Sequence, residues 1–409
     1  MRWVVRTARE ILAYWSQERR TVRQGFIALA IASGVGMLAG VVLGSMDGLL
    51  ERLPGLLVLV PAAIGMRGAI FGALGARLGT GMLTGQYDGR VRRGNFAAQN
   101  VTASITLSFA SSALAALFAR GAAAAIGLPS ISLWDLLTVS MIGGMLASGF
   151  ILSGVLGLGA TAQRRNWDMD AIGSPLITAT GDMVTLPALV VATMLLDFEP
   201  AASLLGGALL VGAVVAGVRG ARTQAPIVRR IMRESLPVLA YSPIMDILAG
   251  SVLEARIHSF VSSPALFVLI PPFIAACGSL GGILAARLGS QFHLGLLESR
   301  RVPQRPARLE ASITALFSLS AFTGVGMVAH FASRLAGFAS PGLGEMIAIS
   351  LTGGFIAFVP LFVTSYWTAA ASFRFGLDPD NHGIPIVTAT MDLLGVLCLV
   401  AAMALYGVS

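Results

Sequence analysis

Two copies of one short motif place an aspartate inside an apolar part of the chain. Residues 168–182 read DMDAIGSPLITATGD and residues 378–392 read DPDNHGIPIVTATMD. Each copy ends on an aspartate and has a threonine four residues earlier, and residues four apart share one face of a helix. The motif therefore predicts two helices that each present a hydroxyl and a carboxylate side by side. The four side chains are Asp182, Asp392, Thr178 and Thr388.

These oxygen-bearing side chains could bind a cation. A carboxylate in a membrane helix costs about 2.5–3.5 kcal/mol on insertion scales, so it normally lines a wet cavity, pairs, or binds a cation. A donor set of carboxylates and hydroxyls favours a hard divalent cation such as Mg2+ over zinc or copper. A proton could instead be shared between two facing carboxylates.

Other acids lie near the motif or in another span. Four stand just before the motif helices, where they either attract cations to a cytoplasmic mouth or serve as caps and turns. These four are Asp168, Asp170, Asp378 and Asp380. Asp246 lies deep in a different apolar stretch, and its position leaves open an accessory or a structural role.

Composition indicates the environment of these side chains. The 409 residues are 56% hydrophobic and 12% charged, with a mean hydropathy of +0.81, which excludes an ordinary soluble domain. We predict an all-α polytopic membrane protein of about eleven transmembrane helices, embedded in a lipid bilayer. The predicted spans are 25–45, 54–78, 100–120, 132–160, 175–196, 200–218, 235–254, 264–289, 310–331, 343–370 and 385–407.

The basic residues orient these spans. All 28 are arginine, and they gather in alternate loops instead of on one solvated face, so nucleic acid is not an expected partner. Arginine-rich loops stay on the cytoplasmic side. We therefore predict a multi-pass protein of the cell membrane with its N-terminus inside and its C-terminus outside. Three arginines fall within spans, namely Arg67, Arg77 and Arg287.

An internal repeat organises the chain. At a constant offset of 210 residues, 14 of 32 positions are identical between residues 54–85 and residues 264–295. The same offset aligns the two aspartate motifs. Because an extra helix separates two five-span copies, the copies should be parallel, with a shared site on the pseudo-two-fold axis between them. The predicted segments are a basic amphipathic cytoplasmic stretch (1–24), repeat 1 (25–197), a linker transmembrane helix (198–220) and repeat 2 (221–409).

Local signals predict where the motif helices begin. In the first copy Ser174 precedes Pro175, so we expect the helix to start there, with the serine as its N-cap and the proline in its first turn. The expected depth of Asp182 is then roughly 10–12 Å from the helix start.

The paired motifs resemble the membrane domain of MgtE-type magnesium transporters. Proline-rich and glycine-rich second helices ending in RLG-[ST], and the paired TAT-x-D segments, carry the resemblance, and two such domains in one chain are similar to the solute-carrier-41 branch. The resemblance implies a central pathway for divalent cations, chiefly Mg2+, lined by Asp182 and Asp392. Family members commonly have a Gly-Asn pair in the second helix, where this chain has Gly68-Ala69 and Gly278-Ser279.

We therefore expect a transporter and not an enzyme, with Mg2+, Mn2+ or another divalent cation as its substrate. One alternative is a proton- or sodium-coupled carrier that uses the same aspartates as relays. An intramembrane aspartyl protease also needs two membrane aspartates, but both acids here belong to copies of one repeated motif. The duplication makes a monomer possible, and a homodimer stays open.

Overall fold

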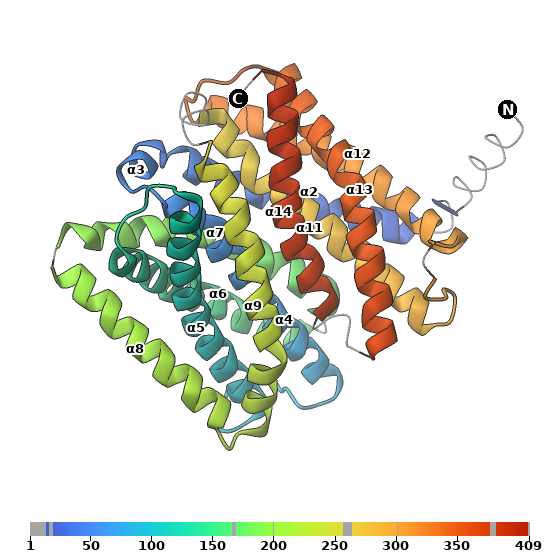
Figure 1. The fold of residues 1–409 in the computed structure, drawn as a ribbon. Coiled ribbons are helices and arrows are strands. Elements are labelled where there is room, and N and C mark those ends of the chain that lie inside the picture. Colours follow the sequence, from blue (N-terminus) through green and yellow to red (C-terminus); the bar gives the residue numbers. More distant parts are fainter. Residues whose placement is uncertain are drawn as a thin grey trace, which may run out of the picture. The chain divides into compact units, whose positions relative to one another are not determined.

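The computed structural model describes residues 14–15, 19–165, 169–198, 200–256, 264–300, 302–376 and 382–407. Within these ranges every regular element is a helix, which confirms the predicted fold class (Figure 1). The elements are α2 (Arg19–Gly44), α3 (Asp47–Arg52), α4 (Leu56–Leu83), α5 (Phe96–Ile126), α6 (Leu133–Arg165), α7 (Met169–Thr193), η1 (Met194–Asp197), α8 (Ala201–Arg222), α9 (Pro226–Glu254), α11 (Pro264–His293), α12 (Arg305–Leu335), α13 (Leu343–Phe375) and α14 (Ile384–Leu405).

Each of the eleven predicted spans falls on one of these helices. By length and composition, nine helices of the described chain could cross a membrane, or ten if the bent α9 counts as one span. In α2 the apolar helix found among the described residues is only Gly34–Gly44. The structure therefore supports a multi-pass membrane protein, and a count of eleven crossings stays a prediction.

Helix α9 is bent by 43° between Pro226–Ser235 and Ala240–Glu254. Pro237 lies in the break. Proline lacks the amide hydrogen that a helix interior requires, and its ring clashes with the preceding turn. The bend separates an arginine-containing first half of α9 from a mostly apolar second half, which contains Asp246 and Glu254.

The repeat is visible in the helix bounds. Helices α6 and α13 begin at Leu133 and Leu343, at the 210-residue offset, and both have 33 residues. Gly85 and Gly295, also 210 apart, follow α4 and α11 with φ of 72° and 71°. Only glycine adopts this left-handed conformation without strain. The duplication thus includes the helix ends.

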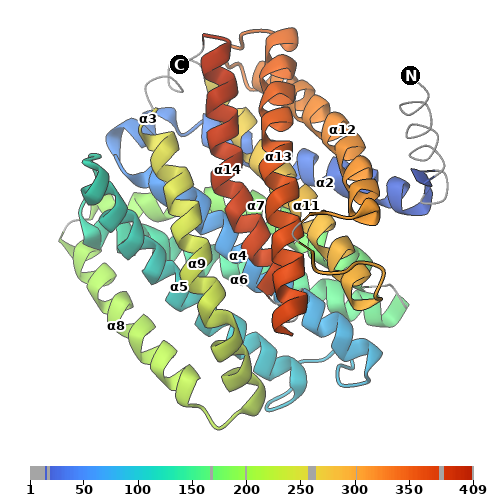
Figure 2. The ribbon, with the colours of Figure 1, turned by 45° about the vertical axis from the view of Figure 1, so that its right-hand side comes forward.

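The chain divides into two compact units that cut across the sequence repeats. Unit 2 comprises Leu38–Val268 and unit 1 comprises Met1–Met37 with Leu269–Ser409. Helix α9, the first helix of the predicted second repeat, therefore belongs to unit 2, where it packs against α4 and α5. Figures 1 and 2 both show α9 running beside α5.

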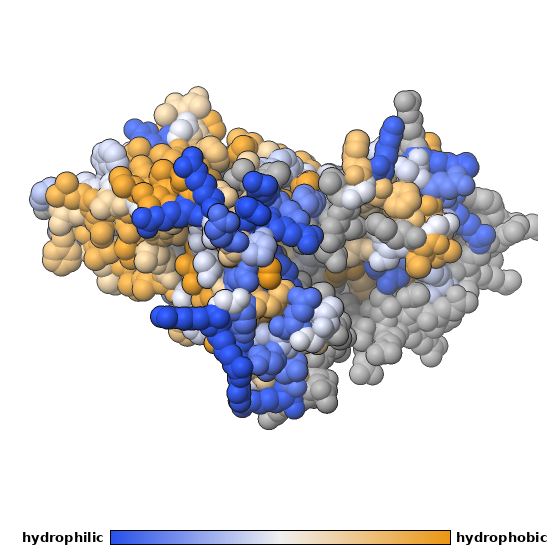
Figure 3. All heavy atoms as spheres, turned by 90° about the horizontal axis from the view of Figure 1, so that it is seen from below, coloured by the Kyte–Doolittle hydropathy of each residue, from blue (hydrophilic) through white to orange (hydrophobic). Residues whose placement is uncertain are grey.

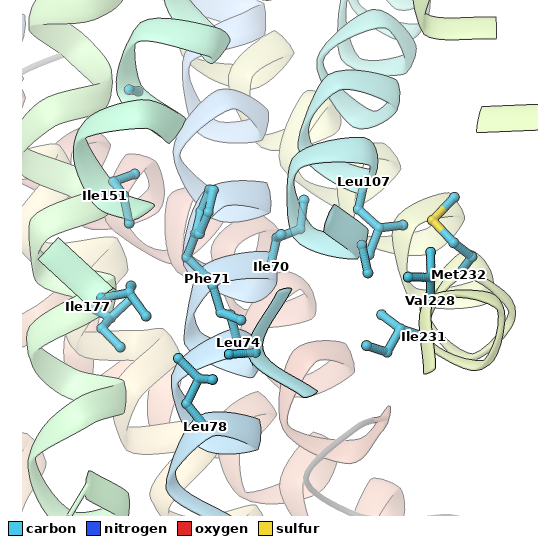
Figure 4. Packing of buried hydrophobic residues seen from close by; sticks show 14 of the residues in the cluster. Ile70, Phe71, Leu74, Leu78, Leu107, Ile151, Ile177, Val228, Ile231 and Met232 are labelled. Atoms are coloured by element: carbon cyan, nitrogen blue, oxygen red, sulfur yellow. The ribbon is translucent and has the colours of Figure 1, made fainter. Parts of the chain in front are cut away.

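The core of unit 2 includes side chains of α9, although α9 belongs by sequence to the second repeat. Apolar residues of α4, α5, α6 and α7 form one buried cluster with the first half of α9 (Figure 4). The labelled members are Ile70, Phe71, Leu74, Leu78, Leu107, Ile151, Ile177, Val228, Ile231 and Met232. Van der Waals packing of this kind holds helices together in a membrane, so α9 is an integral part of this unit.

Unit 1 contains the reciprocal arrangement. The α2 side chain Phe26 meets Phe317 of α12 edge-on, with ring centroids 5.2 Å apart. Gly36 of α2 lies so close to Pro272 of α11 that a methyl group there would be 2.8 Å from the proline Cα. The first helix of each repeat thus packs against helices that belong to the other repeat.

Most of the exposed arginines described in unit 2 lie in or beside two connections. In Figure 1 the turn between α8 and α9 and the loop between α4 and α5 lie at the lower end. Figure 3 views the molecule from below and shows hydrophilic residues, in blue, projecting among hydrophobic ones, in orange. Exposed arginines in or beside these connections are Arg90, Arg92, Arg93, Arg164, Arg219, Arg222, Arg229, Arg230 and Arg233. The side of the membrane that they face stays a prediction.

Candidate cation site

The two motif helices begin differently. In α14, Pro385 lies in the first turn. In the first copy the prediction is wrong, because α7 begins at Met169 and runs through Ser174 and Pro175. A proline within a helix removes one hydrogen bond. Here the helix continues through the proline, so neither residue marks its start.

Several predicted site residues cannot be placed. Asp168, Asp378 and Asp380 lie outside the described residues, so their contribution to a cytoplasmic mouth stays a prediction. Asp170 and Thr178 lie on α7, but their side chains are outside the described part. The predicted residues with described side chains are Asp182, Thr388, Asp392 and Asp246.

Thr388 and Asp392 share one face of α14, as their spacing predicts. Both are partly buried. A methyl group on Gly278 of α11 would lie 3.6 Å from Oδ1 of Asp392 and 3.8 Å from Cβ of Thr388. The Thr388 hydroxyl donates to the carbonyl oxygen of Pro385 at 3.1 Å. Because Gly278 has no side chain, the two oxygen-bearing groups meet the backbone of α11 there.

Asp182 follows a residue of α7 that packs against the corresponding glycine of α4. The preceding residue, Gly181, packs against α4, where a methyl group on Gly181 would be 3.8 Å from the amide nitrogen of Gly68. Gly68 is the counterpart of Gly278 at the 210-residue offset. The Thr185 hydroxyl donates to the Gly181 carbonyl oxygen at 2.6 Å. Each unit therefore brings its aspartate-bearing helix against a glycine of the second helix of the same repeat.

The donor chemistry is oxygen-based. Among the described residues no group of three or more His, Cys, Asp and Glu side chains could hold a metal ion. The two cysteines, Cys277 and Cys398, are free and buried. Of the predicted pairs, only Thr388 and Asp392 are described with both side chains, and they offer a hydroxyl and a carboxylate on one face of α14. A role of these oxygens in binding a cation stays a prediction.

Asp246 lies on a helix other than the motif helices. It is completely buried on α9, and its Oδ2 would be 2.8 Å from a methyl group on Gly65 of α4. Gly36 is its counterpart in the other repeat. The acid therefore distinguishes the two halves, and a direct role in ion binding stays a prediction.

The sequence reasoning missed a duplicated polar contact at the second and third helices. In unit 2 the Arg77 Nε donates to Oδ1 of Asn100 at 2.8 Å. In unit 1 the counterpart arginine, Arg287, pairs with Glu310, which is 2% exposed. Aligning the repeats would have found it, because Asn100 and Glu310 are also 210 residues apart.

The unit 1 contact includes the N-terminal segment. Tyr14 donates its phenolic hydrogen to Oε1 of Glu310 at 2.6 Å, and the Trp15 indole donates to the Ser312 hydroxyl at 3.1 Å. Burial and the adjoining Glu310 carboxylate raise the pKa of the Tyr14 phenol, so it stays a neutral donor. The segment before α2 is thereby attached to α12.

A second missed feature is Arg67 of α4, which is 1% exposed. Its guanidinium donates to the Ala63 carbonyl oxygen and, at 3.3 Å, to the Ser112 hydroxyl, while its Nε has no hydrogen-bond partner. A buried charge in a membrane helix is costly and normally functional.

Comparison with known proteins identifies the family. The profile of the MgtE family, described as a divalent cation transporter, matches residues 60–192 and 270–402. Together the two matches cover more than half of the chain, and they are offset by the same 210 residues as the repeat. The chain belongs to the MgtE family. Its two tandem MgtE domains confirm the internal duplication and the resemblance read from the TAT-x-D motifs.

Relatives of this MgtE-family chain include solute carriers with similar coverage. It is 24% identical to solute carrier family 41 member 2 of Gallus gallus over 84% of this chain and 62% of that protein. It is 25% identical to member 3 of Mus musculus over 83% of this chain and 73% of that protein. The chain thus spans less than two thirds of the chicken relative's length. No solved structure matches.

Proposed function

We propose that this MgtE-family protein carries divalent cations, Mg2+ first, across the cell membrane, with Asp182 and Asp392 as the ion-binding carboxylates. The supporting observation is that the duplicated TAT-x-D motif puts each acid on a helix that packs against a glycine of the second helix. Two parallel copies of one motif can supply both halves of a pathway on a pseudo-two-fold axis between the repeats.

The chemistry of Mg2+ fits such a site. Mg2+ dehydrates reluctantly and is usually held by one or two carboxylates and several retained waters. Two carboxylates would balance its double charge, which also removes their mutual repulsion. The hydroxyls of Thr178 and Thr388 and nearby carbonyl oxygens would accept hydrogen bonds from the retained waters. Binding of this kind is weak enough to permit release, as transport requires.

The arginine-rich loops favour a cytoplasmic N-terminus. Asp168, Asp170, Asp378 and Asp380 precede the motif helices on that predicted side, and their charges would raise the local cation concentration. In this proposal the cytoplasmic mouth and the two membrane carboxylates form one continuous path.

A flux assay tests the proposal. Purified protein in liposomes with an enclosed Mg2+ indicator should show Mg2+ entry with metal salts as the only solutes. Asp182→Asn and Asp392→Asn should each reduce the rate at least tenfold, since each removes half of the compensating charge. Asp197→Asn is a matched control, because this exposed aspartate lies outside the motif helices. Unchanged flux in both motif variants would refute the assignment.

A further inference from the structure

The Arg67 side chain lies in a buried pocket lined by small residues. The guanidinium lies between α4, α5 and α6, where a methyl group on Gly144 would be 2.4 Å from one of its terminal nitrogens. Ala63 and Ser112, which it contacts, are both small. Among the described residues its hydrogen-bond partners are a carbonyl oxygen and a hydroxyl, and none is a carboxylate. The pocket therefore holds an uncompensated positive charge.

The other repeat fills the equivalent space with apolar side chains. At the 210-residue offset the counterparts of Ala63, Arg67 and Ser112 are Phe273, Cys277 and Phe322. These two phenylalanine rings contact each other, with centroids 4.9 Å apart. The surrounding backbone is the same, because Ser140 donates to the carbonyl oxygen of Ser112 at 2.7 Å and Ser350 donates to that of Phe322 at 2.8 Å.

The comparison of the two repeats distinguishes a space-filling role of Arg67 from a role of its charge. Two phenylalanines and a cysteine pack the pocket of the second repeat, so an arginine is not needed to fill the space. Replacing buried charges by apolar residues of similar volume is often neutral or stabilising. The first repeat nevertheless keeps the guanidinium, which points to a role for the charge itself.

The position of Arg67 identifies what the charge acts on. The next residue, Gly68, packs against Gly181, and Gly181 precedes Asp182. Arg67 is thus one residue from the contact that supports the acid-bearing turn of α7. The Coulomb interaction between two charges falls only with the inverse of their distance, and it is stronger in a protein interior than in water. A positive charge at this level of α4 repels a divalent cation twice as strongly as a monovalent one.

We propose that Arg67 is a fixed positive charge that lowers the affinity of the Asp182 carboxylate for its divalent cation and so promotes release. The inference rests on the proposed function, since it deepens the role of the same site. The two halves of the pathway are then unequal, with weaker binding on the side of the first repeat. Arg67 sets the affinity of the site and does not bind the ion itself.

The test compares the Mg2+ concentration at half-maximal flux in liposomes. Arg67→Met should lower this concentration about fivefold or more, because loss of the charge strengthens cation binding. Arg67→Lys keeps the charge and should stay within twofold of wild type. A merely structural role would lower folded yield or maximal rate in both variants and would leave the half-saturating concentration unchanged.

A second variant transplants the apolar packing of the second repeat. Ala63→Phe, Arg67→Cys and Ser112→Phe together remove the charge and supply the side chains that fill the equivalent pocket. This triple variant should show the same lowered half-saturating concentration as Arg67→Met, and it remains testable if Arg67→Met does not fold. Ser112→Ala is the control that removes a hydrogen bond and keeps the charge.

The outcomes are distinguishable. If wild-type protein carries Mg2+ but the neutral variants keep its half-saturating concentration within twofold, the Arg67 inference is wrong and the proposed function stands. An equal shift in Arg67→Lys and Arg67→Met would also overturn it. Absence of any wild-type Mg2+ flux would overturn both, since the inference rests on transport.

Discussion

Gly250 of α9 lies directly against the backbone of Val58 of α4, and a methyl group on this glycine would be 2.3 Å from the valine carbonyl oxygen. The relationship is duplicated, because a methyl group on Gly40 would be 2.3 Å from the carbonyl oxygen of Val268. Each contact joins the first helix of one repeat to the second helix of the other. Small residues that allow backbones to approach are a main source of helix association in membranes.

Gly250→Ala should therefore destabilise the fold. The added methyl group meets a backbone atom that cannot move aside, so we expect a cost of about 1–3 kcal/mol or more. Thermal unfolding in detergent, followed by the loss of monodisperse protein, measures it. Gly217→Ala in α8 is the matched control, since nothing lies within 4 Å of a methyl group there. It should be neutral or stabilising by up to about 1 kcal/mol. Equal melting temperatures would contradict the close contact.

The buried pair of Arg287 and Glu310 predicts a second stability difference. Glu310→Ala leaves the guanidinium without its carboxylate and removes the acceptor for Tyr14, so we expect a loss of about 3–5 kcal/mol. Glu298→Ala serves as control, because its ion pair with Arg300 is well exposed and worth about 0–1 kcal/mol. Chemical unfolding in detergent compares the two. A loss in Glu298→Ala as large as in Glu310→Ala would refute this assignment.

Periodicity and the repeat predicted much of this fold. Hydropathy located the helices, because a long apolar run can be recognised without knowing which distant residues it contacts. The constant 210-residue offset then related the helices of the second repeat to those of the first. The exchange of α2 and α9 could not be predicted, because hydropathy does not indicate which helix a glycine such as Gly250 approaches. The start of α7 was wrong for a related reason. Pro175 is compatible with both a helix start and a helix interior when neighbouring helices support it.

Some features of the candidate site could be predicted from the sequence and others could not. The shared face of Thr388 and Asp392 follows from helical geometry alone, whereas the glycine that meets it is known only from packing. The unusual pocket of Arg67 can be recognised in the sequence only by comparing several positions of the two repeats. Its counterpart is a cysteine, and two small residues around it are replaced together by phenylalanines. Comparing whole pockets between repeats would have found this coupled change.

Gly278→Ala tests whether the face of α11 beside Asp392 belongs to the ion path. A methyl group fits at ordinary contact distance, 3.6 Å from the carboxylate oxygen, so the fold should persist. It would displace water from the carboxylate, and we expect Mg2+ flux in liposomes to fall about threefold to tenfold, the effect of losing one hydrogen bond. Gly324→Ala in α12 is the control, with open space around the added methyl. Equal flux in Gly278→Ala and wild type would exclude this face from the path.

Thr388→Val tests the hydroxyl beside Asp392 without changing the side-chain shape. The Thr388 hydroxyl donates to the Pro385 carbonyl oxygen, so its lone pairs can accept a hydrogen bond from a water on the ion. Loss of one such bond is worth about 0.5–1.5 kcal/mol, which predicts a roughly twofold to tenfold higher Mg2+ concentration at half-maximal flux. Thr390→Val is the matched control. Thr390 makes the same kind of bond, to the Ile386 carbonyl oxygen at 2.6 Å, but two residues further along α14 and therefore on another face. If both valine variants shift the half-saturating concentration equally, the effect comes from the helix backbone and the hydroxyl of Thr388 has no special role in holding the cation.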